Sequence, residues 1–338
     1  MRNLLLVTAI GVALLVLLAT GTALANGGPH GSYTPTSDGC AGCHRAHTGA
    51  APGLLINTNT ALCLTCHGTA ASGSVLNVSD GLYEGTTQGT LNAGMNGGGF
   101  TNAKQDTGLT GTATSGAATS LHSVQGLTDY SATATMWGAG AIDGVAPGTS
   151  GIAFDLYCSS CHDPHGSTNY RMLKTSVNGV AVTVADTDSA AKNYTTGTYY
   201  KAAAAGQWEI STFCSACHTR YMVSTGNSGG TASGDYIFSY RHRIDAPSGA
   251  VDNGKTYTFP GGMSLPVSSV NGGTPTSSPD NRSMVCLTCH YVHGSKATMG
   301  TNSGAVPWPG GGTSPNGNAR SSLLRLDNRG VCENCHAK

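Results

Sequence analysis

The chain has 338 residues, with 17 Lys and Arg balanced by 17 Asp and Glu, and only 10% of its residues are charged. This balance argues against a nucleic-acid-binding surface, which needs clustered positive charge. Glycine contributes 49 residues and aromatic residues only 6%, so large apolar side chains are too few for an ordinary core and something else must fill the interior.

Residues 1–25 predict a signal peptide. Arg2 is followed by an apolar stretch from Leu4 to Leu18 and then by Ala23-Leu24-Ala25, the order of a secretory signal with its cleavage site. An uncleaved anchor is the alternative, although the apolar run is short for a span that needs about 20 residues. We therefore expect an exported chain that begins near Asn26, with no membrane span in the mature part.

All twelve cysteines fall in C-x-x-C pairs, and a histidine follows each pair at once. C-x-x-C-H is the attachment motif of c-type haem: the two thiols form thioethers with the haem vinyl groups, and the imidazole binds the iron. The expected attachment and proximal-ligand residues, in chain order, are Cys40, Cys43 and His44; Cys63, Cys66 and His67; Cys158, Cys161 and His162; Cys214, Cys217 and His218; Cys286, Cys289 and His290; and Cys332, Cys335 and His336. The sequence thus predicts six covalently attached haem c groups with their iron.

Other uses of these cysteines fit the pattern less well. A disulfide framework is usual for an exported cysteine-rich chain, but it gives no reason for a histidine after every pair. A structural zinc site takes its ligands in sets of four, and a thioredoxin-like redox motif is expected once, near a βαβ unit.

Six further histidines match the number of distal ligands that six irons require. Methionine is the other common distal ligand and would raise the reduction potential, but the methionines show no regular relation to the motifs. We therefore predict iron held between two histidines at low potential. The expected distal ligands are His30, His47, His122, His165, His242 and His293.

The motifs repeat in three modules, and such self-similarity indicates a repeat protein. Each module reads as a lone histidine, then C-x-x-C-H-x-x-H, then C-x-x-C-H. The expected boundaries are about 26–105, 106–225 and 226–338, within a single hexahaem domain over residues 26–338. Each module would hold two haems and two spare histidines.

The last histidine of each extended motif is expected to serve a neighbouring haem. His47, His165 and His293 lie three residues after a proximal histidine, on the same side of the helical turn, so they reach their own iron poorly. If each serves a haem of the preceding module, His47 has no earlier module and is free for another copy of the chain. If each serves a haem of its own module, the protein closes on itself and stays monomeric.

The expected fold is mostly irregular coil, with short helices at the haem motifs, few small strands and a core formed by stacked haems. Long segments rich in Gly, Ser, Thr and Asn separate the motifs, and structureless loops of that length are unusual without a bound group to wrap.

The segments Cys40-Ala-Gly-Cys-His-Arg-Ala-His47, Cys158-Ser-Ser-Cys-His-Asp-Pro-His165 and Cys286-Leu-Thr-Cys-His-Tyr-Val-His293 resemble the paired C-x-x-C-H class of multihaem cytochromes. The total of six motifs resembles the outer-surface cytochromes of metal-reducing microbes that polymerise into filaments. This resemblance implies one continuous haem stack. It also implies that His47 ligates the haem at Cys286, Cys289 and His290 of the adjacent subunit.

These features predict an electron-transfer protein rather than an enzyme, since an enzyme needs an iron with an open position and the ligand count leaves none. The first expectation is an extracellular, electron-conducting homopolymer whose partners are other cytochromes or extracellular electron acceptors. A monomeric periplasmic or outer-surface shuttle is the alternative, and a multihaem reductase is a weaker one.

Overall fold

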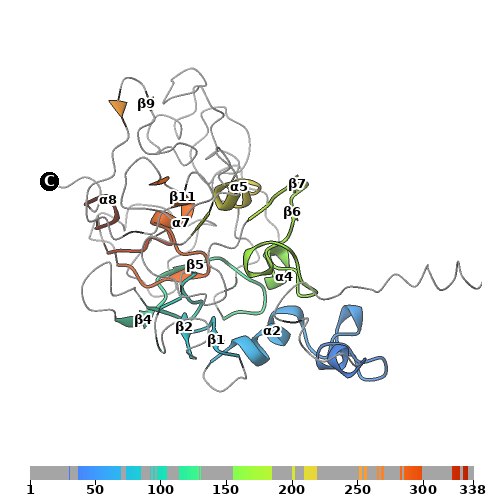
Figure 1. Ribbon diagram of the computed structural model, residues 1–338. Coiled ribbons are helices and arrows are strands. Elements are labelled where there is room, and N and C mark those ends of the chain that lie inside the picture. The colour runs from blue at the N-terminus through green and yellow to red at the C-terminus, as the bar shows by residue number, and fades with distance from the viewer. Residues whose placement is uncertain are drawn as a thin grey trace, which may run out of the picture.

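The computed structural model describes residues 30, 37–69, 74–84, 92, 94–95, 97–104, 114–128, 130, 155–184, 200–201, 209–218, 251–252, 255–256, 265, 268–269, 282–283, 285–298, 322–327 and 330–333. Short helices and two- or three-residue strands are joined by irregular segments throughout this part of the chain (Figure 1). The prediction of a mostly irregular fold with short helices at the motifs is confirmed.

Helical turns coincide with the C-x-x-C segments because three side chains that must point to one side need a turn of helix. The helices are η2 (Ser37–Gly42), η3 (Pro52–Leu54), α2 (Asn59–His67), α4 (Cys158–Cys161), η4 (Tyr170–Met172), α5 (Glu209–Ser215), α7 (Cys286–Cys289) and α8 (Gly330–Glu333).

The strands form small sheets, most of them antiparallel pairs. They are β1 (Leu76–Asn77) with β2 (Leu82–Tyr83), β3 (Asn102–Lys104) with β4 (Ser115–Ala117), β5 (Ser120–Leu121) with β13 (Gly294–Ser295), β6 (Ser176–Val177) with β7 (Val180–Ala181), β9 (Val251–Asp252) with β10 (Lys255–Thr256), and a set of β8 (Tyr200–Lys201), β11 (Ser268–Ser269) and β12 (Arg282–Ser283) in which β8 and β11 run parallel. The pair β5–β13 matters most here, because it joins segments far apart in the chain, with Gly294 opposite Leu121 and Ser295 opposite Ser120.

Apolar packing among the described residues gathers where the second and third modules meet. One cluster combines residues of η4, β6, α5 and α7, and the attachment residues Cys161 and Cys217 pack against it. A smaller cluster around Leu265, Leu326 and Val331 contacts Cys289. Small apolar clusters thus support the attachment turns.

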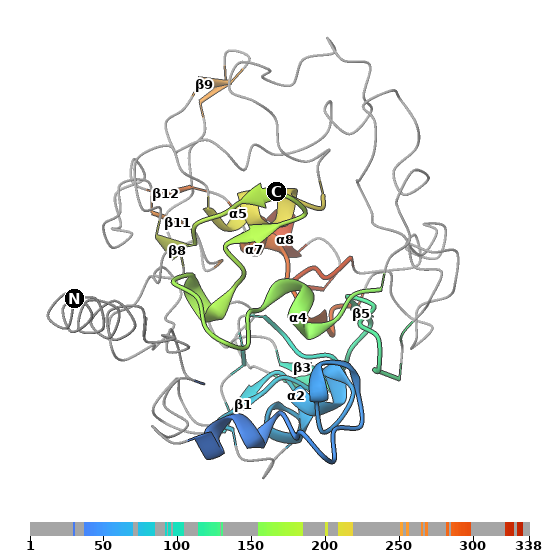
Figure 2. The ribbon, with the colours of Figure 1, turned by 90° about the vertical axis from the view of Figure 1, so that its right-hand side faces the viewer.

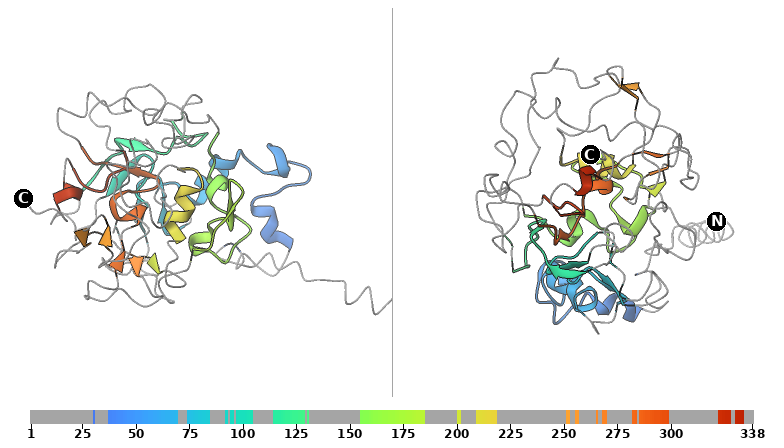
Figure 3. Two further views of the ribbon diagram at one scale, coloured as in Figure 1. Left: turned by 90° about the horizontal axis from the view of Figure 1, so that it is seen from above. Right: turned by 90° about the vertical axis from the view of Figure 1, so that its left-hand side faces the viewer.

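The motif-bearing helices follow one another through the molecule in chain order. In Figure 3 (left), η2 and α2 lie at one end, α4 and α5 follow, and α7 and α8 lie toward the other end. Figure 2 shows the same progression, from α2 and α4 to α5, α7 and α8. The first and last attachment segments therefore lie far apart.

Several sequence predictions fall outside the described residues: the signal peptide, His242, and Cys335 with His336 of the last motif. Among the described helices, none is long and apolar enough to cross a membrane.

Candidate haem-binding sites

The described attachment turns share one backbone geometry. The amide of the motif histidine donates to the carbonyl oxygen of the first motif cysteine, at 2.8 Å for His44, 3.0 Å for His162, 2.9 Å for His218 and 3.1 Å for His290. One helical turn thus separates the first cysteine of each of these motifs from its histidine, which is the spacing that haem attachment requires.

The first attachment turn of each module is closed by a returning segment that the sequence analysis did not identify. We call residues 53–56, 171–174 and 322–325 the return loops. Each contains a leucine that forms a β-bridge with the motif histidine: Leu55 with His44, Leu173 with His162 and Leu324 with His290. Two backbone hydrogen bonds flank every bridge. In one, the amide of the residue after the motif histidine donates to the carbonyl oxygen of the residue before the leucine: Arg45 to Leu54, Asp163 to Met172, and Tyr291 to Leu323. In the other, the amide of the residue after the leucine donates to the carbonyl oxygen of the second motif cysteine: Ile56 to Cys43, Lys174 to Cys161, and Arg325 to Cys289.

Two consecutive left-handed residues shape each return loop. Their φ angles are 75° and 59° at Gly53 and Leu54, and 54° and 55° at Arg171 and Met172. Ser322 and Leu323 have φ angles of 50° and 61°. Non-glycine residues rarely adopt this conformation, so its occurrence at the same place in all three loops marks a constraint at the site.

The return loops fix the orientation of the proximal imidazoles. His44 Nδ1 lies 2.7 Å from the Gly53 carbonyl oxygen, His162 Nδ1 lies 2.9 Å from that of Arg171, and His290 Nδ1 lies 2.8 Å from that of Ser322. Because a carbonyl oxygen only accepts, Nδ1 carries the proton and Nε2 is left as the metal-binding nitrogen. This is the usual arrangement around a metal-ligating histidine.

Pairs of histidine rings from different segments lie at nearly the same separation. The ring centroids are 6.1 Å apart for His44 and His165, 5.9 Å for His30 and His67, 6.4 Å for His162 and His293, and 6.2 Å for His122 and His218. Each pair joins one motif histidine to one of the spare histidines.

This separation is the one that two axial imidazoles need. Histidine nitrogen binds a transition metal at about 2 Å, so two rings on opposite sides of one ion have centroids about 6 Å apart. The angles between the paired ring planes run from 12° to 59°, and such angles differ only by rotation of one ring about the common axis. The residues therefore fit a bis-histidine iron.

Burial favours the neutral, metal-binding form at five of the described histidines. Burial lowers the pKa of His122 to about 4 and that of His293 to about 3, with a nearby histidine adding to each shift. It also lowers the pKa of His67, His162 and His290.

Strand pairing between distant segments positions two of the spare histidines. In the β5–β13 pair, the His122 amide donates to the His293 carbonyl oxygen at 3.1 Å. The loop before β3 supports the same place, since the His293 amide donates to the Gly97 carbonyl oxygen at 2.7 Å. Gly98 has φ +69°, and a Cβ there would lie 1.9 Å from the Gly294 carbonyl oxygen, so this close approach requires glycine.

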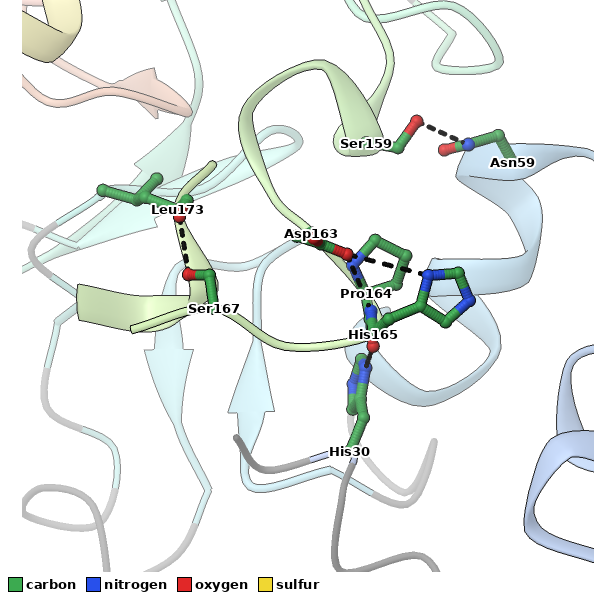
Figure 4. A network of polar contacts seen from close by, with 8 residues as sticks. All are labelled: His30, Asn59, Ser159, Asp163, Pro164, His165, Ser167 and Leu173. Carbon is green, nitrogen blue, oxygen red and sulfur yellow. Dashed lines mark hydrogen bonds and ion pairs between the residues drawn. The ribbon is translucent and has the colours of Figure 1, made fainter. Parts of the chain in front are cut away.

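Attachment turns of successive modules touch through their first cysteines. The Cys63 thiol donates a hydrogen bond to the sulfur of Cys158. This contact raises the pKa of Cys63 and lowers that of Cys158 to about 7. Cys214 and Cys286 form the same contact, which raises the pKa of Cys214. Asn59 Nδ2 also donates to Ser159 Oγ at 2.7 Å (Figure 4). The second attachment site of one module therefore lies beside the first site of the next.

Two predicted ligands are not brought to a partner ring. Within the described residues, no histidine ring lies against His47 or His290, and His47 is exposed. In the chain, His47 follows η2 and His290 directly follows α7. Figure 3 (left) shows η2 at one end of the molecule and α7 further along it, toward the other end.

Comparison with known proteins finds one matching family model and similar solved structures. The family model for the doubled CXXCH motif matches residues 34–72 and 152–180. Among solved structures, the chain resembles the outer membrane cytochrome S filament from Geobacter sulfurreducens, with 19% identity, 88% of this chain and 98% of that chain covered, and a TM-score of 0.34. The OmcS nanowires from Geobacter sulfurreducens give the same identity and coverage with a TM-score of 0.33. No curated protein sequence matches the chain.

By the matched motifs and the repeated attachment turns, the chain resembles the multihaem c-type cytochromes of the paired C-x-x-C-H class. The doubled motifs indicate covalently bound haem c.

Proposed function

We propose that the chain binds six haems, each between two histidines, and polymerises into an extracellular electron-conducting filament. The four histidine ring pairs at 5.9–6.4 Å carry this proposal. They supply ligand pairs for the first four attachment sites: His44 with His165, His67 with His30, His162 with His293 and His218 with His122.

The pairs follow one rule. The lone histidine at the start of a module serves the second haem of that module, as His30 and His122 do. The last histidine of an extended motif serves the first haem of the preceding module, as His165 and His293 do. This agreement with the three-module boundaries supports reading the chain as three linked dihaem units.

The same rule assigns the remaining sites. His242 serves the haem at Cys332, Cys335 and His336 of its own module. His47 has no preceding module in its chain, so it serves the first haem of the third module, at His290, in another copy. The exposure of His47 and the lack of a histidine ring against it among the described residues support a contact between chains.

The protein's own residues explain electron transfer without catalysis. Bound haem supplies one-electron exchange at iron. The cysteines would fix each haem, the return-loop carbonyls would orient the imidazoles of His44, His162 and His290, and the paired spare histidines would supply the second ligand, so that no iron is left open to a substrate. Cys63 lies beside Cys158 and Cys214 lies beside Cys286, so the attachment sites of successive modules are side by side, as short electron steps require.

The expected location and partners of the protein follow from this proposed function. We assign residues 1–25 to a signal peptide, the mature protein to the cell exterior, and its partners to other copies, other cytochromes and extracellular electron acceptors. A monomeric shuttle is the second candidate, and it requires that His47 and His290 find partners within one chain.

The test compares His47→Ala with Thr48→Ala, a neighbouring exposed change, by electron microscopy of the secreted protein. His47→Ala should abolish filaments, and Thr48→Ala should leave them intact. Filaments of normal length in His47→Ala would overturn the bridging assignment, and native protein that stays monomeric would favour the shuttle.

A further inference from the structure

We propose that two arginines of the return loops raise the reduction potentials of the haems beside them. Arg171 acts on the haem at His162, and Arg325 acts on the haem at His290. Both haems then have a higher potential than the equivalent haem of the first module, at His44, and take up electrons before it. This inference rests on the haem binding of the proposed function and not on the polymer.

The three return loops occupy equivalent places but differ in charge. Residues 53–56 contain no charged side chain, residues 171–174 contain Arg171 and Lys174, and residues 322–325 end with Arg325. Each loop makes the same β-bridge and the same backbone hydrogen bonds to its attachment turn. A difference in loop charge therefore distinguishes three sites whose backbone geometry is alike.

Arg171 is held beside the third site by two buried tyrosines. Its carbonyl oxygen lies 2.9 Å from Nδ1 of His162. Its guanidinium carbon lies 5.5 Å from the ring centroid of Tyr170, within the range of a cation–π contact, and Nη2 donates to the Tyr83 hydroxyl at 3.4 Å. Burial is the main cause of the low pKa of His162 and of His293, and the Arg171 charge adds to both shifts. The charge of Arg171 therefore reaches both histidines of the third site.

Arg325 repeats this chemistry from a different loop position. Its side chain is only 1% exposed, and Nε donates to the carbonyl oxygen of Leu287 in α7 at 2.7 Å. The guanidinium carbon lies 4.4 Å from the ring centroid of Tyr291, the residue after His290. Burial is the main cause of the low pKa of His290, and Arg325 adds to it. An arginine on a tyrosine ring thus lies beside this attachment turn as well.

The first return loop has apolar residues at both of these positions, Gly53 and Ile56. The cation next to His44 in the chain is Arg45, which is exposed, so water screens its charge. The first site therefore receives less positive charge from its own loop and motif than the other two.

Fixed charges act on a haem because reduction of ferric to ferrous iron adds one electron and lowers the charge of the site by one. A nearby cation favours the reduced form and a nearby carboxylate the oxidised form, most strongly where burial limits screening. The Asp163 carboxylate lies 3.7 Å from Nδ1 of His165, whose ring pairs with His44 (Figure 4). Loop cations and this carboxylate therefore place the first haem below the other two.

The experiment is a potentiometric titration of the holoprotein, with electrons supplied by a chemical reductant through redox mediators. Arg171→Met and Arg325→Met remove the charge, and Arg171→Lys and Arg325→Lys keep it. Arg45→Met is the matched control, since it removes the same charge from an exposed position beside a motif histidine. Mass spectrometry of haem peptides and absorption spectra establish the haem content and ligation of each sample.

Each methionine variant should lower the reduction equilibrium constant of one high-potential haem about tenfold, which is about 59 mV for one electron, and the two variants should affect different haems. The lysine variants should keep most of the native potential, and Arg45→Met should shift no haem as far.

Arg171 is partly exposed, so Arg171→Met decides the question even if Arg325→Met fails to fold. Native potentials in Arg171→Met, or an equal loss in Arg171→Lys, would overturn the inference, while bis-histidine spectra in the same samples would leave the proposed function intact. Holoprotein without haem at Cys158 and Cys161 would overturn both.

Discussion

The three extended motifs carry residues of different charge at one equivalent position. The residue two before the last histidine is Arg45, Asp163 or Tyr291, and their amides make matching hydrogen bonds to the return loops. Asp163 Oδ1 lies 3.7 Å from Nδ1 of His165. A carboxylate there increases the electron donation of the imidazole and lowers the potential of its haem.

Asp163→Asn should therefore raise the potential of the haem at Cys40 and Cys43. Asparagine retains the oxygen that accepts the His165 amide at 3.0 Å, so the turn is preserved. Because 72% of the His165 side chain and 41% of the Asp163 side chain are exposed, the shift should shrink as ionic strength rises. Potentiometric titration at low and high salt measures it, and an unchanged or lower potential would contradict the assignment.

At this residue scale, counting predicted the candidate ligands but not their pairing. Four pairs draw their members from segments as far apart as His162 and His293, and only the folded chain brings these together. Under the proposed function, these ring pairs assign His165 and His293 to haems of the preceding module. For His47 the choice stays a prediction.

Among the secondary-structure elements, the pair β5–β13 and the loop before β3 hold the two spare histidines of the third and fourth sites. Gly98→Ala should destabilise the protein by more than the 1–3 kcal/mol typical of a left-handed residue, because its Cβ would also meet the Gly294 carbonyl oxygen at 1.9 Å. Gly179→Ala is the matched control, since Gly179 has φ +78° and nothing within 4 Å. Denaturant titration compares them, and equal losses would contradict this role for Gly98.

The helical turns at the motifs could be predicted because C-x-x-C-H requires them. The return loops could not, because leucine, methionine, arginine and serine all disfavour the left-handed conformation that they adopt there. A signal existed in the spacing: the carbonyl partner follows the motif histidine by nine residues in the first two modules. In the third module the separation is 32 residues, and this insertion hides the repeat.

At the scale of the whole molecule, the composition predicted too few large apolar side chains for an ordinary core. The buried apolar side chains of the described residues gather in clusters, and the larger one packs against Cys161 and Cys217 of the attachment turns. The order of η2, α2, α4, α5, α7 and α8 through the molecule (Figure 3) separates η2, which precedes His47 in the chain, from α7, which precedes His290. A head-to-tail contact would bring His47 of one copy to His290 of the next. Repeated head-to-tail contacts of this kind build an open filament rather than a closed dimer.

Carbon monoxide binding to the reduced protein tests the central claim most directly. If every iron lies between two histidines and His47 supplies the last ligand from a neighbour, filaments should bind no carbon monoxide. Dissociated protomers should bind about one molecule per chain, at the haem of His290. Binding by intact filaments would contradict the claim that no iron has an open position, and protomers that bind none would contradict the exchange of His47 between chains.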